Sequence, residues 1–160
     1  MELRAEVVIH APAHAAWLVL GERFGQIGEW AAPIVASSLD GEPTVGSVRT
    51  CQIARFGPFK PGAIKERLVA FDAPAMSLAY ESAEGMPAFV KYALNRWSVQ
   101  PETDTTCVVR THATVELQGP MRLLTLFLKF RLQADGARVL DELRYLIEHG
   151  RPHPRKLAAA

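Results

Sequence analysis

The stretch GPMRLLTLFLKFRLQADGARVLDELRYLIEHG, residues 119–150, is the longest segment of helical pattern in the chain. Between about 121 and 148 its apolar residues recur at helical spacing and form one stripe, namely Met121, Leu128, Leu132, Val139, Leu143 and Leu146. Gly119 and Pro120 precede this helix, and Gly150 and Pro152 end it. A long helix with one apolar stripe must bury that stripe against another layer of structure.

Strands are predicted along most of the chain that precedes this helix. Residues 2–10 alternate apolar and polar side chains, which is typical of a half-buried strand. Ala11-Pro12 ends this strand, and two short helices follow, around Trp17 to Leu20 and around Phe24 to Trp30. Glycine and proline residues then separate six further strands, at about 34–39, 46–54, 63–71, 77–83, 91–100 and 106–117.

Strands joined in sequence by short turns form an antiparallel sheet. The sequence therefore predicts an α+β fold, in which a curved antiparallel sheet of six or seven strands wraps around the long C-terminal helix. We expect one domain over residues 1–155. The last residues, 156–160, read Lys-Leu-Ala-Ala-Ala and are interpreted as a vector-derived tail.

Composition excludes several classes of function. Eighteen Lys and Arg residues oppose seventeen Asp and Glu, so no net charge favours nucleic acid. Cys51 and Cys107 are the only cysteines, and no histidines lie at ligand spacing, so we expect neither a disulfide nor a metal site, and no cofactor. No signal peptide or spanning segment is evident, so we expect a cytoplasmic, bacterial-type protein without stable membrane insertion.

Five segments together resemble one family. They are IHAPAHAAWLVLGERFGQIGEW (9–30), SSLDG (37–41), VGSVR (45–49), KERLVAFD (65–72) and LDELRYLIEHG (140–150). In order and spacing they are similar to the polyketide cyclase/dehydrase branch of the SRPBCC superfamily, whose START-like and birch-pollen-allergen-like members have the helix-grip fold. The resemblance covers nearly the whole chain, but it implies the fold more than an activity, because the superfamily includes receptors, lipid carriers and cyclases.

The resemblance also implies which side chains line an internal cavity. On the strand matching VGSVRTCQI these are Arg49, Cys51 and Ile53, and on the next strand Glu66 and Leu68. The following strand would contribute Leu78, Tyr80 and Ser82. The loop at 55–62, with Phe56 and Phe59, matches the gate of the receptor relatives, and EGMP at 84–87 matches their latch.

The strand at 91–100 can be aligned in two ways that place opposite faces inward. An alignment on Tyr92 and one on Val99-Gln-Pro101 differ by a one-residue slip, which turns every side chain over. Asn95 and Tyr92 are therefore alternative cavity residues. Trp97 and Trp30 could stack on a bound ring or could simply fill the core.

Arg49 and Glu66 are the strongest candidates for a functional pair, because a buried arginine needs a partner. Three interpretations remain open: an ion pair that only fixes the sheet, a pair that orients a ligand, and a pair that performs acid/base chemistry. Tyr80 could donate a hydrogen bond to a bound carbonyl. Arg110 and His112 are interpreted as surface residues that join the polar face of the first strand, because their strand alternates with apolar residues.

The segment LLTLFLKF (123–130) carries more apolar side chains than one stripe uses. Leu123, Leu126, Phe127 and Phe130 could line the cavity, form a dimer contact or touch a membrane. The sequence favours cavity lining together with a homodimer contact.

These patterns predict a protein that binds a small hydrophobic molecule, aromatic, polyketide-like or lipid-like, in an internal cavity. The alternative is a cofactor-free cyclase or dehydrase, in which Arg49 stabilises an enolate. A third hypothesis is an interaction module whose interior is too filled to bind anything.

Overall fold

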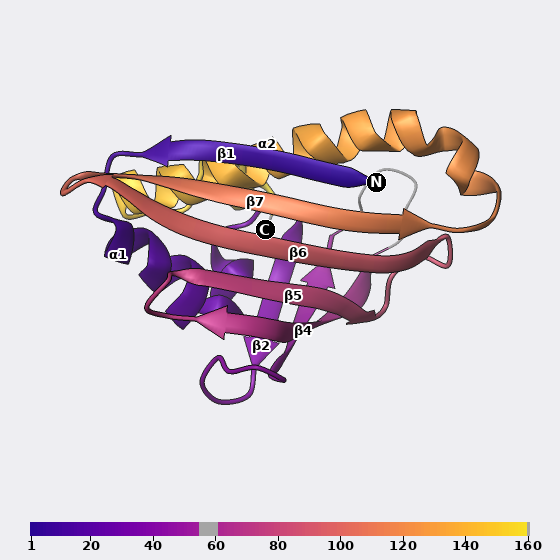
Figure 1. The fold of residues 1–160 in the computed structure, drawn as a ribbon, viewed down its shortest axis with the longest axis horizontal. Coiled ribbons are helices and arrows are strands. Elements are labelled where there is room, and N and C mark those ends of the chain that lie inside the picture. The colour runs from indigo at the N-terminus through magenta and orange to yellow at the C-terminus, as the bar shows by residue number, and fades with distance from the viewer. Residues whose placement is uncertain (55–60, 160) are drawn as a thin grey trace.

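The computed structural model describes residues 1–54 and 61–159. Seven strands form one antiparallel sheet in the order β1-β7-β6-β5-β4-β3-β2. Their bounds are β1 (Glu2–Ile9), β2 (Ile34–Leu39), β3 (Val48–Ile53), β4 (Gly62–Asp72), β5 (Ser77–Glu84), β6 (Val90–Thr103) and β7 (Thr106–Leu117). The predicted α+β class, the antiparallel sheet and the strand positions are confirmed (Figure 1).

Three short helical segments follow β1, where the sequence predicted two short helices after Pro12. They are α1 (Ala13–Trp17), a π-helical turn η1 (Leu18–Glu22) and a 3₁₀ helix η2 (Phe24–Glu29). Near the end of the chain, η3 (Gly119–Leu124) leads into the long helix α2 (Thr125–His149), and α3 (Pro154–Ala158) follows. The predicted helix therefore begins as a 3₁₀ turn after Pro120 and becomes α-helical only at Thr125.

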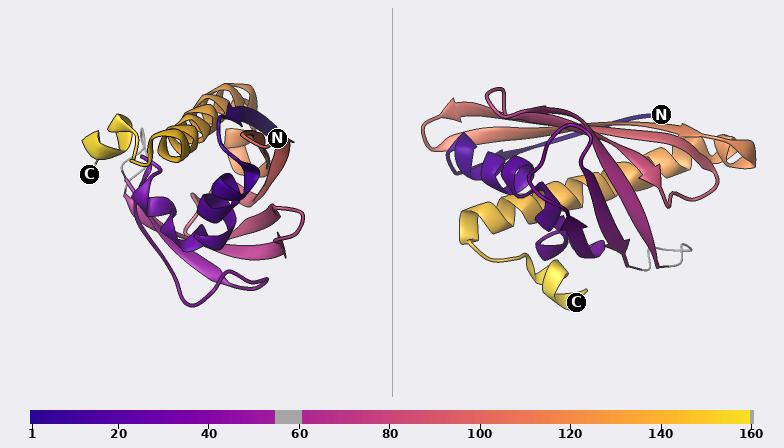
Figure 2. Two further views of the ribbon diagram at one scale, coloured as in Figure 1. Left: turned by 90° about the vertical axis from the view of Figure 1, so that its left-hand side faces the viewer. Right: turned by 90° about the horizontal axis from the view of Figure 1, so that it is seen from below.

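The sheet curves until its two edges approach each other, and α2 lies across the gap between them (Figure 2). On one side α2 packs against β1. On the other side the buried carboxylate of Glu142 accepts a 2.8 Å hydrogen bond from the backbone N–H of Ala32, just before β2. The ends of the sheet are thus bridged by one helix, which is the helix-grip arrangement that the sequence predicted.

The core lies between the concave face of the sheet, the short helices and the second half of α2. Fully buried side chains include Ile9, Leu68, Val109, Leu140 and Leu143. The only large side chains that α2 buries completely come from residues 140–143, whereas no residue of its first half is buried. The helix therefore grips the sheet with its C-terminal half.

A close approach of two backbones fixes the short helices against the sheet. The N–H of Gly28 donates a 2.8 Å hydrogen bond to Oγ of Ser37 in β2, and that hydroxyl donates to the carbonyl of Gly25. A Cβ atom at Gly28 would lie 2.6 Å from the backbone nitrogen of Ser37. Only glycine fits at this contact, which places η2 over the sheet.

Residues 154–158 take part in the packing of the domain. Lys156 is buried, and its Nζ donates a 2.6 Å hydrogen bond to the carbonyl of Ile34 at the start of β2. Arg155 donates from Nε to Glu142 and from Nη2 to Asp141. These contacts hold α3 against the C-terminal half of α2.

Candidate functional site

Arg49 and Glu66 face each other across β3 and β4, on the concave side of the sheet. The two residues are direct cross-strand partners, as the alternation of both strands predicted. Nε and Nη2 of Arg49 donate to the same oxygen, Oε2 of Glu66, at 2.9 and 2.5 Å. The Arg49 side chain is 3% exposed and that of Glu66 is 15% exposed, so this ion pair is mostly shielded from water.

Phe24 and Tyr80 complete the surroundings of the Arg49 guanidinium. Its Nη1 donates a 2.7 Å hydrogen bond to the carbonyl of Phe24, and its Cζ lies 3.8 Å from the centre of the Phe24 ring. The ring of Tyr80 lies 5.1 Å from the same carbon. A planar cation that contacts two aromatic rings and one carboxylate is held in one orientation.

The electrostatics keep this arginine charged. Burial acts to lower the pKa of Arg49, but the charge and hydrogen bond of Glu66 together with the neighbouring Tyr80 and Cys51 outweigh burial, and the pKa lies above its ordinary value. Burial raises the pKa of the neighbouring Cys51 thiol to about 12, and its Sγ donates a 3.4 Å hydrogen bond to Oε2 of Glu66. Burial, together with the charge of Glu66, also raises the pKa of Tyr80. Cys51 and Tyr80 are therefore neutral at physiological pH.

Two polar atoms beside this cluster have unused hydrogen-bonding capacity. Oε2 of Glu66 accepts three hydrogen bonds, whereas Oε1 accepts none from residues 1–54 and 61–159. The buried indole N–H of Trp97 lies beside Tyr80 but meets the geometry of a hydrogen bond with no group in the same residues. An unpaired buried donor is costly, so a polar group of a bound molecule would be accepted here.

The remaining predicted residues are placed by the register of the sheet. Leu68 pairs with Tyr80, Tyr80 with Asn95, and Leu78 with Trp97. Asn95 accepts a 3.1 Å hydrogen bond from the hydroxyl of Thr111. Leu68, Leu78, Tyr80 and Trp97 are buried. The alignment on Val99 is thus the right one, because Tyr92 pairs with Glu116, whose carboxylate meets Lys91 at the surface.

The structure describes the predicted surface pair and Trp30 but not the predicted gate residues. Phe56 and Phe59, the predicted gate residues, lie outside the described residues. Arg110 and His112 pair with Glu6 and Glu2 of β1 on the outer face of the sheet, as predicted. Trp30 is buried in the core.

The predicted cavity-lining role of four helix residues is wrong. Leu123, Leu126, Phe127 and Phe130 are 68 to 90% exposed, because the first half of α2 extends beyond the part of the helix that grips the sheet. Cys51 and Cys107 are both free and buried.

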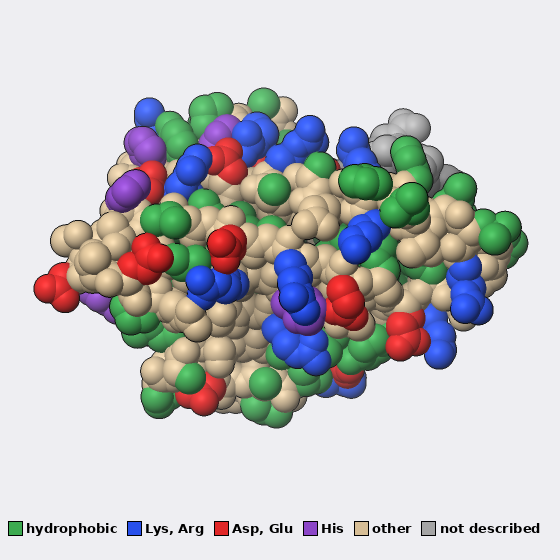
Figure 3. Space-filling model, turned by 45° about the horizontal axis from the view of Figure 1, so that its top comes forward, with side chains coloured by type: hydrophobic (Ala, Val, Ile, Leu, Met, Phe, Trp, Pro, Cys, Tyr) green, Lys and Arg blue, Asp and Glu red, His purple; other side chains and the backbone are tan. Residues whose placement is uncertain are grey.

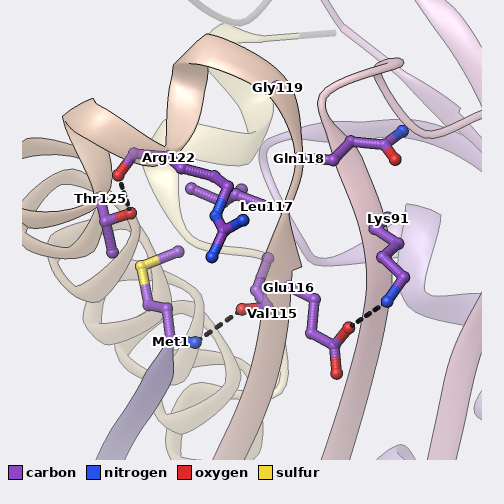
Figure 4. A pocket seen from close by; sticks show the side chains of 9 residues that line it. All are labelled: Met1, Lys91, Val115, Glu116, Leu117, Gln118, Gly119, Arg122 and Thr125. Carbon is purple, nitrogen blue, oxygen red and sulfur yellow. Dashed lines mark hydrogen bonds and ion pairs between the residues drawn. The ribbon is translucent and has the colours of Figure 1, made fainter.

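Two hollows among the described residues lie at the ends of strands. The larger, of about 460 Å³, lies where β7 runs into η3 (Figure 4). It is lined by Met1, Lys91, Val115, Glu116, Leu117, Gln118, Gly119, Arg122 and Thr125. The smaller, of about 200 Å³, lies between the turn at 82–86 and the start of β6, beside the predicted latch. Sequence reasoning missed the larger hollow, because no motif marks the meeting of β7 and η3.

A family model described as polyketide cyclase / dehydrase and lipid transport matches residues 1–148. The chain belongs to this family. No match was found among curated proteins. The family accounts for the helix-grip fold, and its description names both catalysis and lipid transport.

Solved structures agree on the fold. A Thermobifida fusca protein is 28% identical, with 95% of this chain and 97% of that chain covered and a TM-score of 0.66. The Zhui aromatase/cyclase from Streptomyces sp. R1128 is 14% identical, with 96% and 99% covered and a TM-score of 0.73. The di-domain aromatase/cyclase BexL of the BE-7585A biosynthetic pathway is 15% identical with a TM-score of 0.72. The match covers 92% of this chain but only 46% of BexL.

Among residues 1–54 and 61–159, no helix has the length and apolar character needed to cross a membrane.

Proposed function

We propose that this protein binds a small, mostly apolar, aromatic or polyketide-like molecule between the concave face of the sheet and α2. The single observation that carries the proposal is that Oε1 of Glu66, beside a fixed, buried guanidinium, accepts no hydrogen bond from residues 1–54 and 61–159. An ion pair that served only to fix the sheet would gain from using both carboxylate oxygens. Among residues 1–54 and 61–159 the unused oxygen instead leaves one acceptor for a ligand, on the same face of the sheet as the buried indole N–H of Trp97.

The apolar part of such a ligand would contact Leu68, Tyr80 and Trp97 on neighbouring strands. A hydroxyl or carbonyl group at the edge of the ligand would reach Oε1 of Glu66 or the indole N–H of Trp97. The family description, which names polyketide cyclases and lipid transport, supports ligands of this size and chemistry.

The test compares two aromatic probes of similar size, 2-naphthol and 2-methylnaphthalene. We expect the protein to prefer 2-naphthol about tenfold or more, because a hydrogen bond to a charged group contributes ~1.5 to 3 kcal/mol. Binding is read from thermal stability, to which a ligand at ~100 times its dissociation constant adds ~2.7 kcal/mol.

The matched variants are Arg49→Met/Glu66→Leu and Arg67→Met/Glu81→Leu. The first removes the inner pair, whereas the second removes an exposed ion pair on the same region of the sheet. Both should fold, because replacing a whole buried pair by apolar residues is often neutral. Only the inner variant should lose the preference for 2-naphthol. Failure of the wild-type protein to bind either probe would reject the proposal.

A cofactor-free cyclase or dehydrase is the second candidate function. The arrangement that favours it is a carboxylate with one free oxygen next to a guanidinium that stays charged. Glu66 could take a proton from the carbon between two carbonyls, and Arg49 could stabilise the enolate that forms. The new carbon–carbon bond would then form by attack of the enolate carbon on another carbonyl of the same chain, whose C=O π bond opens to an alkoxide that takes the proton back from Glu66.

Product analysis separates the two functions. A synthetic tetraketide thioester is incubated with the protein, and the cyclised product is measured against spontaneous cyclisation. An enzyme accelerates formation of one ring pattern, and Glu66→Gln abolishes that acceleration. A carrier changes neither the rate nor the ring pattern.

A further inference from the structure

The start of α2 and the turn before it present an unpartnered apolar surface. Leu123 is 90% exposed, Phe130 72%, Phe127 69% and Leu126 68%. Leu124, beside them, is also exposed. Figure 3 shows hydrophobic side chains gathered at the right-hand end of this face, over η3 and the first turns of α2. We refer to these five residues as the apolar ridge.

The ridge lies on the side of the helix that faces away from the molecule. Within α2, Phe130 follows Leu126 by four positions and Phe127 by three, so these three residues share one face, and Leu123 precedes them in η3. Leu128 and Leu132 occupy the opposite face and are partly covered by the protein. The first half of α2 is therefore apolar on two sides, of which one has no partner within the described chain.

The charged residues of the segment that carries the ridge all have one sign. Between residues 117 and 134 the chain contains Arg122, Lys129 and Arg131 and no acidic residue. Lys129 and Arg131 flank Phe130 in sequence, so they lie on the borders of the ridge. The next acidic residue along the helix, Asp135, forms an ion pair with Arg131.

An apolar surface bordered by basic residues differs from a self-complementary dimer contact. In a symmetric contact each patch meets its own copy, so two ridges in register would bring the same cations toward each other. A surface that carries negative charge above an apolar layer is complementary to the apolar ridge and to the basic residues on its borders. Long basic side chains can then reach the charged groups while apolar side chains enter the layer beneath.

We propose that the apolar ridge docks the protein on the surface of a bilayer that contains anionic lipids, with the first half of α2 lying in the interface. Leu123, Phe127 and Phe130 enter the boundary between headgroups and acyl chains. Lys129 stays at the level of the lipid phosphates. The helix lies on the membrane and does not cross it.

The test measures co-sedimentation of the full chain with vesicles. One vesicle type contains phosphatidylcholine alone, and the other contains phosphatidylcholine with phosphatidylglycerol. We expect binding to the anionic vesicles, binding at least tenfold weaker to the neutral ones, and a clear loss of binding at 1 M salt, where the Debye length is ~3 Å.

Two pairs of substitutions provide the comparison. Phe127→Ser/Phe130→Ser removes the centre of the ridge, and Val45→Ser/Leu157→Ser removes two apolar side chains that are equally exposed, at 64%, elsewhere. The ridge variant should bind anionic vesicles at least tenfold more weakly, whereas the control should bind like the wild type. Lys129→Gln should reduce the difference between anionic and neutral vesicles.

Three results would overturn the proposal. One is the absence of binding to anionic vesicles by the folded wild type. Another is equal binding by the ridge variant and the control. The third is a wild-type dimer in sedimentation velocity that the ridge variant converts to a monomer, because the ridge would then be covered by a second copy.

Discussion

The guanidinium carbon of Arg49 lies 3.8 Å from the centre of the Phe24 ring, and Nη1 of the same arginine donates to the backbone carbonyl of Phe24. One residue of the 3₁₀ helix η2 thus contacts the cation through both its ring and its backbone. This contact connects the short helices to the concave face of the sheet. The position of the ion pair therefore depends on how η2 is seated as well as on the strands.

The Arg49–Glu66 pair should contribute strongly to stability only as long as it is intact. Glu66→Ala leaves a buried guanidinium without its carboxylate, and we expect a loss of ~3 kcal/mol or more in the free energy of unfolding. Equilibrium unfolding in urea measures this loss.

Glu84→Ala is the matched control for this substitution. Glu84 lies on the neighbouring strand and pairs with Lys65, but both side chains are about half exposed or more. An exposed pair contributes little, so the control should unfold nearly like the wild type. Equal effects of the two substitutions would mean that water reaches Arg49 freely.

The packing of η2 against β2 can be tested by substituting Gly28. A methyl group at Gly28 would overlap the backbone of Ala36 and Ser37, so Gly28→Ala should destabilise the protein by about 2 kcal/mol or more. Gly136 lies inside α2, and a Cβ there would meet no atom within 4 Å. Gly136→Ala should therefore stabilise by about 1 kcal/mol, because alanine favours the helix. Unfolding curves of the two variants should shift in opposite directions.

The inward faces of some strands were predictable from the sequence, and those of others were not. Alternation with period two, together with the family resemblance at VGSVR and KERL, placed Arg49 and Glu66 on the inward faces of β3 and β4, so their facing was predictable. The strand at 91–100 was ambiguous, because a bulge between Val90 and Tyr92 shifts its register by one residue. Such a bulge changes which side chains face inward without altering the apolar pattern nearby.

The first half of α2 could not be placed from its sequence. Its apolar residues fit a helix that is buried on several sides, and the sequence therefore favoured cavity lining for Leu123, Leu126, Phe127 and Phe130. The curvature of the sheet decides how much of the helix is covered, and curvature depends on contacts far apart in the chain. The contact of Phe24 with Arg49 was missed for the same reason, since 25 residues separate them.

Stability should decrease in alkaline solution because of two buried groups. The thiol of Cys51 has a pKa raised from 9.0 to about 12, and the pKa of Tyr80 is raised above 10.0, both mainly by burial. In the unfolded chain these protons are lost near the lower values, whereas the folded protein keeps them. The stabilisation is therefore complete below about pH 9 and is lost as the pH rises toward 12.

The double variant Cys51→Ala/Tyr80→Phe removes both ionisable groups and keeps the aromatic ring. Between pH 9 and 11 its free energy of unfolding should fall less steeply than that of the wild type, by up to ~1.4 kcal/mol per pH unit for each group. Urea unfolding at several pH values measures both slopes. Parallel curves for the two proteins would show that neither group is buried in its neutral form.

Lys156 tests whether the end of the chain belongs to the packed structure. The side chain is 7% exposed, its Nζ donates to the carbonyl of Ile34, and burial lowers the pKa of the amine. Lys156→Ala removes this hydrogen bond together with the packing of the aliphatic stem, so we expect a loss of about 1 to 3 kcal/mol. Leu157→Ala, a change in the neighbouring residue that is 64% exposed, should have little effect.

If residues 156–160 were an idle vector-derived tail, as their sequence alone indicates, both substitutions would leave the urea midpoint unchanged. A loss confined to Lys156→Ala would instead make this lysine part of the connection between α3 and the edge of the sheet at β2.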